Sequence, residues 1–159
     1  MHIPFTSSHA ETLADFPPLN RPRTIAIDYN DGTLYTVDYG NNGSVLKYDQ
    51  KTSTATRPFG QFARCVYINQ KTQNVYMGTG SRTILRFAPD GTGETVVAGG
   101  NGQGTGLKQF QYPSGLIMDQ YDNLYISDHT VHRITKWAPN ATLSELIGGV
   151  DGADNDSTH

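Results

Sequence analysis

The sequence predicts an all-β chain made of three similar units, each with four short antiparallel strands. The chain repeats itself, because a Tyr flanked by apolar and β-branched residues recurs at Tyr35, Tyr76 and Tyr125, 41 and then 49 positions apart. Short runs rich in β-branched and aromatic residues alternate with turn residues such as 41–43 (Asn-Asn-Gly). A helical period is weak and confined to the neighbourhood of 10–13.

Each strand is predicted from period-two alternation between turns. In the first unit, for example, Leu34 and Thr36 alternate with Tyr35 and Val37. Four strands in a period of about 40 to 50 residues are typical of β-propeller blades. The expected strands are 24–28, 33–38, 44–48 and 55–59 in the first unit, 65–69, 74–79, 83–87 and 94–98 in the second, and 115–119, 123–128, 133–137 and 144–147 in the third.

The organisation that follows is three blades between two terminal segments. We expect blades at about 20–60, 61–100 and 110–149, within a propeller region covering 20–149. A Gly-rich run at 99–106 lacks the Gly-Lys-Ser/Thr of a phosphate-binding loop, and it is predicted to link the second and third blades. Residues 1–19 are an N-terminal extension or part of a preceding blade, and 150–159 are a tail or the start of a missing blade.

The third unit contains three recognisable motifs, at 112–119 (YPSGLIMD), 123–128 (NLYISD) and 132–134 (HRI). Together these motifs resemble an NHL repeat. The unit departs from the pattern at Asp122, where the family favours Gly, and at Val131, where it favours Asn. The first unit keeps Asp28, Gly32, Tyr35 and Asp38, and the second has Asn69 and Thr79 at the two Asp positions.

The resemblance implies a partial NHL-type propeller, because the family usually closes a ring of about six blades. We therefore expect a fragment of a longer repeat protein, or copies that self-associate to complete a ring. The motif residues imply a structural role, with the Asp residues accepting amide hydrogen bonds, Asp128 pairing with Arg133, and the large aromatic side chains lying between blades. These structural residues are Tyr35, Asp38, Tyr76, Tyr125, Asp128, His132, Arg133 and Trp137.

Composition and charge argue against several function classes. The formal net charge is −3 and the isoelectric point is about 5.9, which disfavours nucleic acid as a partner. The sequence has no apolar run long enough to span a membrane. The single cysteine, Cys65, excludes an internal disulfide and is expected to be a buried, inert thiol. Since His129 and His132 alone do not make a site, no metal or cofactor is expected.

The cellular compartment is left open by the sequence. The N-terminus lacks the basic and apolar regions of a secretory signal peptide. Three glycosylation triplets begin at Asn42, Asn140 and Asn155, and they favour an extracellular setting if the chain is part of a longer secreted product. Otherwise a cytoplasmic location is expected.

The leading functional hypothesis is a non-enzymatic module that binds a protein or glycan partner through its loops. An alternative is the substrate- or RNA-binding propeller of a tripartite-motif ubiquitin ligase, although no RING, B-box or coiled-coil pattern is present. Another is a lyase or lactonase propeller with a metal on its axis. No catalytic residue is assigned. The candidate binding residues are Tyr39, Asn41, Arg82, His129 and His132.

Overall fold

The computed structural model describes residues 16–149, and these residues form three four-stranded antiparallel sheets. The weakly periodic segment at 10–13 lies outside them. The strands of the first sheet are β1 (Pro22–Ile27), β2 (Leu34–Asp38), β3 (Ser44–Asp49) and β4 (Thr54–Thr56). Those of the second are β5 (Ala63–Ile68), β6 (Val75–Thr79), β7 (Thr83–Phe87) and β8 (Thr95–Gly99). Those of the third are β9 (Pro113–Met118), β10 (Leu124–Asp128), β11 (Arg133–Trp137) and β12 (Glu145–Gly149).

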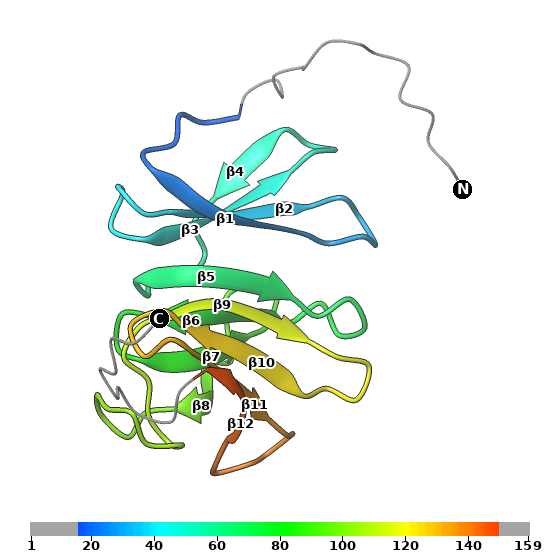
Figure 1. The fold of residues 1–159 in the computed structure, drawn as a ribbon. Helices are drawn as coiled ribbons and strands as arrows, with labels where there is room; N and C mark the ends of the chain where they lie inside the picture. Colours follow the sequence, from blue (N-terminus) through cyan, green and yellow to red (C-terminus); the bar gives the residue numbers. More distant parts are fainter. Residues whose placement is uncertain (1–15, 150–159) are drawn as a thin grey trace, which may run out of the picture.

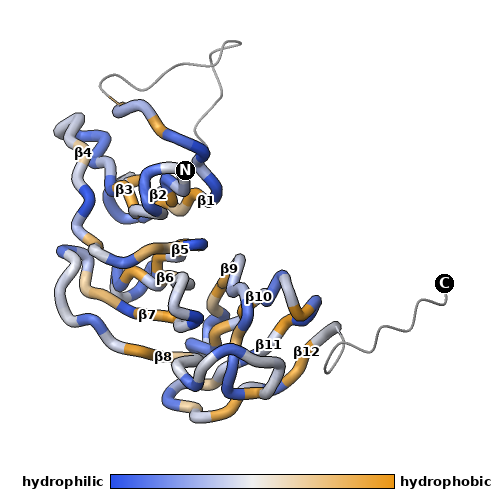
Figure 2. The backbone as a smooth tube through the Cα atoms, turned by 90° about the vertical axis from the view of Figure 1, so that its left-hand side faces the viewer, coloured by the Kyte–Doolittle hydropathy of each residue, from blue (hydrophilic) through white to orange (hydrophobic). Residues whose placement is uncertain are grey.

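Each sheet is a meander in which neighbouring strands follow one another along the chain. The sheets pack face against face in chain order (Figure 1). They form an arc, and the first strands of the sheets, β1, β5 and β9, gather on its concave side (Figure 2). The part of the chain that the structure describes contains no helix, so none that could cross a membrane. The prediction of an all-β, propeller-type architecture with three four-stranded blades is confirmed.

Two apolar clusters hold the three sheets together. Alternate residues of a strand point to opposite faces, so the second sheet contributes one set of side chains to each neighbour. The cluster between the first and second sheets includes Tyr35, Val37 and Met77, all buried. The cluster between the second and third sheets includes Ile84, Ile126 and Trp137. Trp137 and the first two tyrosines of the repeat are buried between sheets, whereas Tyr125 is half-buried on the outer face of the third sheet.

The fourth strand of the first sheet is shorter than the sequence predicts. We expected a strand over 55–59, but β4 ends at Thr56. Pro58 has no amide hydrogen to donate to a ladder. Instead, Phe59 leaves the sheet and packs between the first two sheets, with its ring centre 5.3 Å from that of Phe87.

The two outer faces of the arc differ. On the first sheet, Tyr48 is 2% exposed, and the ring of Phe16 lies 4.8 Å from its ring. The segment before β1 runs over this face (Figure 1). On the third sheet, Ile117 and Ile134 remain 62% and 45% exposed. One outer face is therefore partly covered by the chain's own segment and the other presents apolar side chains to solvent.

Candidate functional site

The inner strand of each sheet carries a β-bulge near its beginning. The extra residues are Arg23 and Thr24 in β1, Arg64 in β5 and Ser114 in β9, where the register against the second strand shifts. A bulge breaks the alternation of a strand and re-aims the side chain it carries. Because the bulges recur at equivalent positions, the three sheets present polar side chains at the same end of the inner edge.

The two bulge arginines, from the first and second sheets, stack against aromatic rings contributed by the first and third sheets. The Cζ atom of Arg64 lies 4.0 Å from the ring centre of Tyr112, and that of Arg23 lies 5.9 Å from the same ring. Arg23 also stacks on Tyr39 at 4.0 Å and donates a hydrogen bond to the Tyr112 hydroxyl. Stacking of this kind holds a guanidinium in place while leaving its edge available for hydrogen bonds.

Two further rings extend this arrangement. The ring of Phe62 meets Tyr39 edge-on with centres 5.3 Å apart, and the exposed His129 lies 5.8 Å from Tyr112. We term the whole set the rim cluster. It consists of Arg23, Tyr39, Phe62, Arg64, Tyr112 and His129.

The rim cluster is electropositive. Within residues 16–149, neither Arg23 nor Arg64 forms an ion pair. The Nε atom of Arg64 is also buried without a hydrogen-bond partner. Two guanidinium groups beside one phenol ring repel each other, so an anionic or acceptor-rich group bound here would relieve that repulsion.

The aspartates that end the second strands are occupied elsewhere. The Asp38 carboxylate accepts the Asn20 amide at 2.7 Å and pairs with Arg57 at 3.0 Å. Burial opposes ionisation of Asp38, but hydrogen bonds from Asn41, Asn20 and Arg57 hold its pKa below the usual value. The Asp128 carboxylate accepts the backbone amides of residues 111 and 112, both at 2.8 Å. Each aspartate thereby fixes the segment that enters β1 or β9.

Arg133 does not follow the expectation of a pair with Asp128, because no ion pair joins them in the described part of the chain. Its guanidinium instead donates to the backbone carbonyls of Thr105, Gly106 and Gln109. These carbonyls belong to the linker between β8 and β9, which includes the Gly-rich run. Arg133 therefore anchors the linker.

The remaining candidate binding residues lie in hairpins at this end of the sheets. Asn41 donates to Asp38 at 2.5 Å, so it supports the aspartate rather than the rim cluster. Arg82 and His132 occupy left-handed turn positions, with φ of 64° and 54°. The glycosylation candidates Asn42 and Asn140 lie in exposed turns, and Asn155 lies outside the described residues. Of the five candidate binding residues, Tyr39 and His129 belong to the rim cluster.

Sequence reasoning missed Arg23, Arg64, Phe62 and Tyr112. A signal was available, since aligning the repeats places Arg23 and Arg64 at the same position before the first strand of each unit. What the sequence did not show was the bulge that turns both side chains toward the inner edge.

Beyond the rim cluster, the inner strands line an apolar hollow of about 510 Å³. Ile25 and Ile27 come from β1, Tyr67 from β5 and Ile117 from β9. Ile25 is 71% exposed. A ligand bound at the rim would thus find polar contacts at one end of the concave side and apolar contacts farther along it.

The described residues offer little for metal or thiol chemistry. No group of three or more His, Cys, Asp or Glu side chains in 16–149 could hold a metal ion. Burial raises the pKa of the Cys65 thiol to about 11, so the nucleophilic thiolate is scarce at neutral pH.

Comparisons with known proteins place the fold. No protein-family model matches the chain, and no curated protein matches it in sequence. A gluconolactonase from Xanthomonas campestris superposes with a TM-score of 0.68 at 15% identity, covering 84% of this chain and 49% of that one. An auxiliary nutrient binding protein from Bacteroides thetaiotaomicron gives 0.63 at 20% identity, covering 79% and 35%. A streptogramin B lyase gives 0.58 at 14% identity, covering 82% and 41%.

These similarities concern the fold alone, because the identities are low. The chain spans less than half the length of each of these structures. They include two enzymes and a binding protein, so the shared fold does not decide between catalysis and binding. The chain has the architecture of part of a β-propeller, built from three of its radial sheets.

Proposed function

We propose that the chain is a non-enzymatic, NHL-type propeller module that binds a protein or glycan partner at the rim cluster. The observation that carries the proposal is the recurrence of a bulge at the start of every inner strand, which brings Arg23 and Arg64 beside Tyr112. Further sheets, from a longer chain or a second copy, would complete the channel around this site.

The chemistry of the rim cluster supports binding. Arginine and tyrosine are enriched among residues that dominate binding energy, because they combine a large contact area with directional donors. The guanidinium groups lack carboxylate partners in the described part of the chain. The Cys65 thiol is buried, and burial raises its pKa to about 11, so it is a poor nucleophile at neutral pH. These features favour recognition over catalysis.

A binding screen with a charge-matched control tests the proposal. A glycan array covers sugar ligands, and a photo-crosslinking residue placed at Tyr39 covers protein partners in the source tissue. The double variant Arg23→Ala/Arg64→Ala should weaken binding by at least about tenfold, a modest cost for two lost guanidinium contacts. The control Lys51→Ala/Lys108→Ala removes the same charge from exposed positions and should bind as the wild type does.

Two outcomes would replace this proposal with another class. Hydrolysis of gluconolactone that depends on an added divalent metal would favour the lactonase alternative. Tight RNA binding that falls steeply with salt would favour a nucleic-acid role, since released counterions dominate such binding. Binding that the double variant leaves unchanged would move the site away from the rim cluster.

A further inference from the structure

A second cavity lies between the second and third sheets, at the opposite end from the rim cluster. The rim cluster forms where β1, β5 and β9 begin, whereas this cleft opens where β5 and β9 have ended. Its volume is about 310 Å³. Both walls come from described residues of two packed sheets, so the cleft needs no further sheet to be complete.

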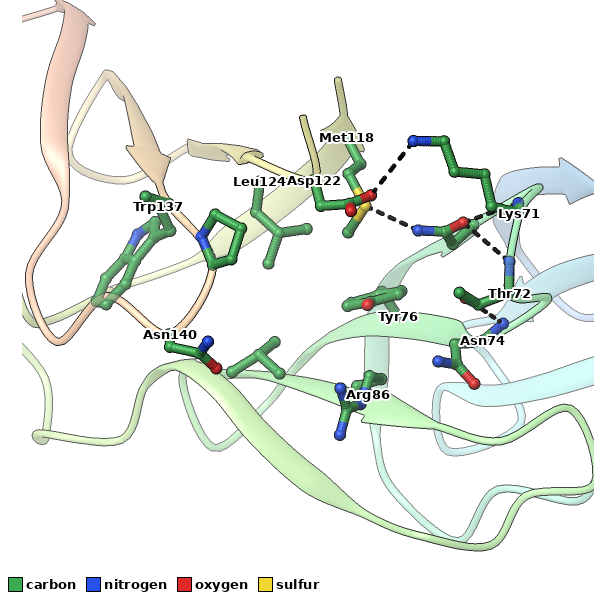
Figure 3. Close-up of a pocket in the computed structure, with 14 residues that line it drawn as sticks. Lys71, Thr72, Asn74, Tyr76, Arg86, Met118, Asp122, Leu124, Trp137 and Asn140 are labelled. Carbon is green, nitrogen blue, oxygen red and sulfur yellow. Dashed lines mark hydrogen bonds and ion pairs between the residues drawn. The ribbon is translucent and has the colours of Figure 1, made fainter. Parts of the chain in front are cut away.

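One side of the cleft is closed by contacts that bridge the two sheets. Lys71 lies 3.9 Å from the Asp122 carboxylate and donates to the Gln120 carbonyl at 2.9 Å. The Asn69 amide contacts the sulfur of Met118 at 3.0 Å. Figure 3 shows the contact of Lys71 with Asp122 and the contact at Met118 together on one side of the hollow. The charge of Lys71 is therefore already matched by Asp122.

The walls of the cleft are mixed, because seven of its 14 lining residues are polar or charged and the others include large apolar side chains. Leu124 of the third sheet and Tyr76 of the second sheet lie toward one another across it, and Trp137 lies farther along the third-sheet wall (Figure 3). Leu124 and Trp137 are only 5% and 3% exposed. These side chains belong to the cluster that joins the two sheets, so the walls are firmly packed. Such surfaces suit a compact ring, which loses little conformational freedom on binding.

Arg86 adds an unmatched positive charge to the cleft. It lies on β7 opposite Tyr76, and it forms no ion pair in the described part of the chain. Its guanidinium donates a long hydrogen bond of 3.5 Å to the Thr95 hydroxyl and also interacts with the Tyr76 hydroxyl. Burial raises the pKa of Tyr76, although the neighbouring Arg86 opposes the shift. The guanidinium of Arg86 can donate hydrogen bonds to a carboxylate from its terminal nitrogens.

We propose that this cleft binds a small carboxylic acid with a six-membered ring, whose carboxylate pairs with Arg86 and whose ring lies between Leu124 and Tyr76. The carboxylate would pair with Arg86, which forms no ion pair in the described part of the chain. The ring would contact Leu124 and Tyr76, which line the cleft. Asn74 and Asn140 line the mouth and offer amides to ring substituents. Both sugar acids and aromatic acids carry this chemistry. The inference is independent of the rim cluster.

Fluorescence of Trp137 measures binding directly, because it is the chain's single tryptophan and it lines the cleft. D-glucuronate and phenylacetate are titrated beside their neutral counterparts, D-glucose and 2-phenylethanol. At least one acid should bind with a dissociation constant of about 1 mM or tighter, as expected for a ligand of this size. Its neutral counterpart should bind at least about tenfold more weakly. The acid that binds shows whether the ligand class is sugar acids or aromatic acids.

Matched variants locate the site. Arg86→Ala should weaken binding of the acid by at least about tenfold, and Arg86→Lys should restore part of it. Lys47→Ala is the control, because Lys47 holds the equivalent position in the first sheet. Arg64→Ala should have no effect, which separates this cleft from the rim cluster. Thermal unfolding of each variant verifies that it is folded.

Two results would overturn the inference. If neither acid changes the fluorescence at concentrations well above 1 mM, roughly the dissociation constant expected for a small ring acid, the cleft is packing space rather than a site. If the acids bind equally well to folded Arg86→Ala, the carboxylate does not pair there. Loss of binding in Arg64→Ala alone would place the acid at the rim cluster instead, which also overturns the assignment while leaving the proposed module intact.

Discussion

The two interfaces between neighbouring sheets are built from the same parts but close differently. At each, a Phe from the linker packs against the aromatic residue that ends the third strand of the following sheet. Phe59 meets Phe87 with ring centres 5.3 Å apart, and Phe110 meets Trp137 at 5.7 Å. All four side chains are buried.

The difference lies in one cationic residue. Lys47 sits opposite Tyr35, and its Nζ atom donates to the Pro89 carbonyl of the second sheet at 3.0 Å. Arg86 sits opposite Tyr76, but no hydrogen bond takes it across to the third sheet within residues 16–149. A long side chain that bridges two sheets seals the space between them. The same repeat pattern therefore gives a bridged interface in one case and an open cleft in the other. The outcome depends on whether the long cationic side chain reaches the next sheet, as Lys47 does and, within the described residues, Arg86 does not.

The largest expected effect tests whether the two aromatic pairs contribute equally to the free energy of unfolding. Phe59→Ala and Phe110→Ala should each lower the free energy of unfolding by about 3–5 kcal/mol, because each removes a buried ring from a packed cluster. Urea titration followed by circular dichroism and by Trp137 fluorescence gives both values. A loss below about 1 kcal/mol for Phe110→Ala would mean that the open interface collapses around the deletion, and the comparison would fail.

The next effect concerns how the two linkers are anchored, and it depends on pH. Arg57 holds the first linker to the buried Asp38, whereas Arg133 holds the second through peptide carbonyls, which do not titrate. The pKa of Asp38 is lowered in the folded state, so its contribution is present above the unfolded value near 4 and is lost as pH falls through the folded value.

Asp38→Asn should therefore cost about 2–3 kcal/mol at pH 7, and the difference from wild type should shrink as pH drops below about 4. Urea titrations between pH 2 and pH 7, roughly spanning the reference pKa of Asp, measure it. The conservative control is Asp31→Asn at an exposed turn. A constant difference between Asp38→Asn and wild type across that range would contradict the anchoring role.

A smaller effect sharpens the comparison at the sealed interface. Lys47→Ala removes one hydrogen bond to a carbonyl and should cost about 1 kcal/mol. Arg86→Ala lacks a bridging bond to lose, so it should cost less than Lys47→Ala. Thermal unfolding of the two variants side by side measures the gap. Equal losses would show that the reach of Lys47 does not distinguish the interfaces.

The smallest expected effect is measured by chemical modification of the native thiol of Cys65. Cys65 is 1% exposed in the cluster of the second interface, and burial raises its pKa to about 11. Iodoacetamide at pH 8 should therefore modify it at least about a hundredfold more slowly than an unfolded control. Mass spectrometry follows the reaction. If the interfaces open separately, Phe110→Ala accelerates it more than Phe59→Ala does, and equal acceleration would indicate a single cooperative unit.

Much of the fold was predictable from the sequence, because alternation and turn residues act locally. The strands around Tyr35, Tyr76 and Tyr125 lie where the pattern predicts them. The predicted end of the fourth strand was wrong, because Phe59 packs between the sheets against Phe87, a partner that is distant in sequence.

The candidate site was less predictable, for the same reason. Tyr39 and His129 could be chosen as hairpin residues, but their neighbours come from other sheets. The bulges that aim Arg23 and Arg64 are departures from alternation, and the repeat pattern does not encode them visibly. The partner of Arg133 likewise depended on the folded path of the linker.

The unequal outer faces give this array of sheets a polarity. A sheet added behind the third would bury Ile117 and Ile134 at once, whereas one added in front of the first would have to displace Phe16 from Tyr48. Packing of a further sheet should therefore be easier behind the third sheet than in front of the first, because the outer face of the first sheet is already partly covered.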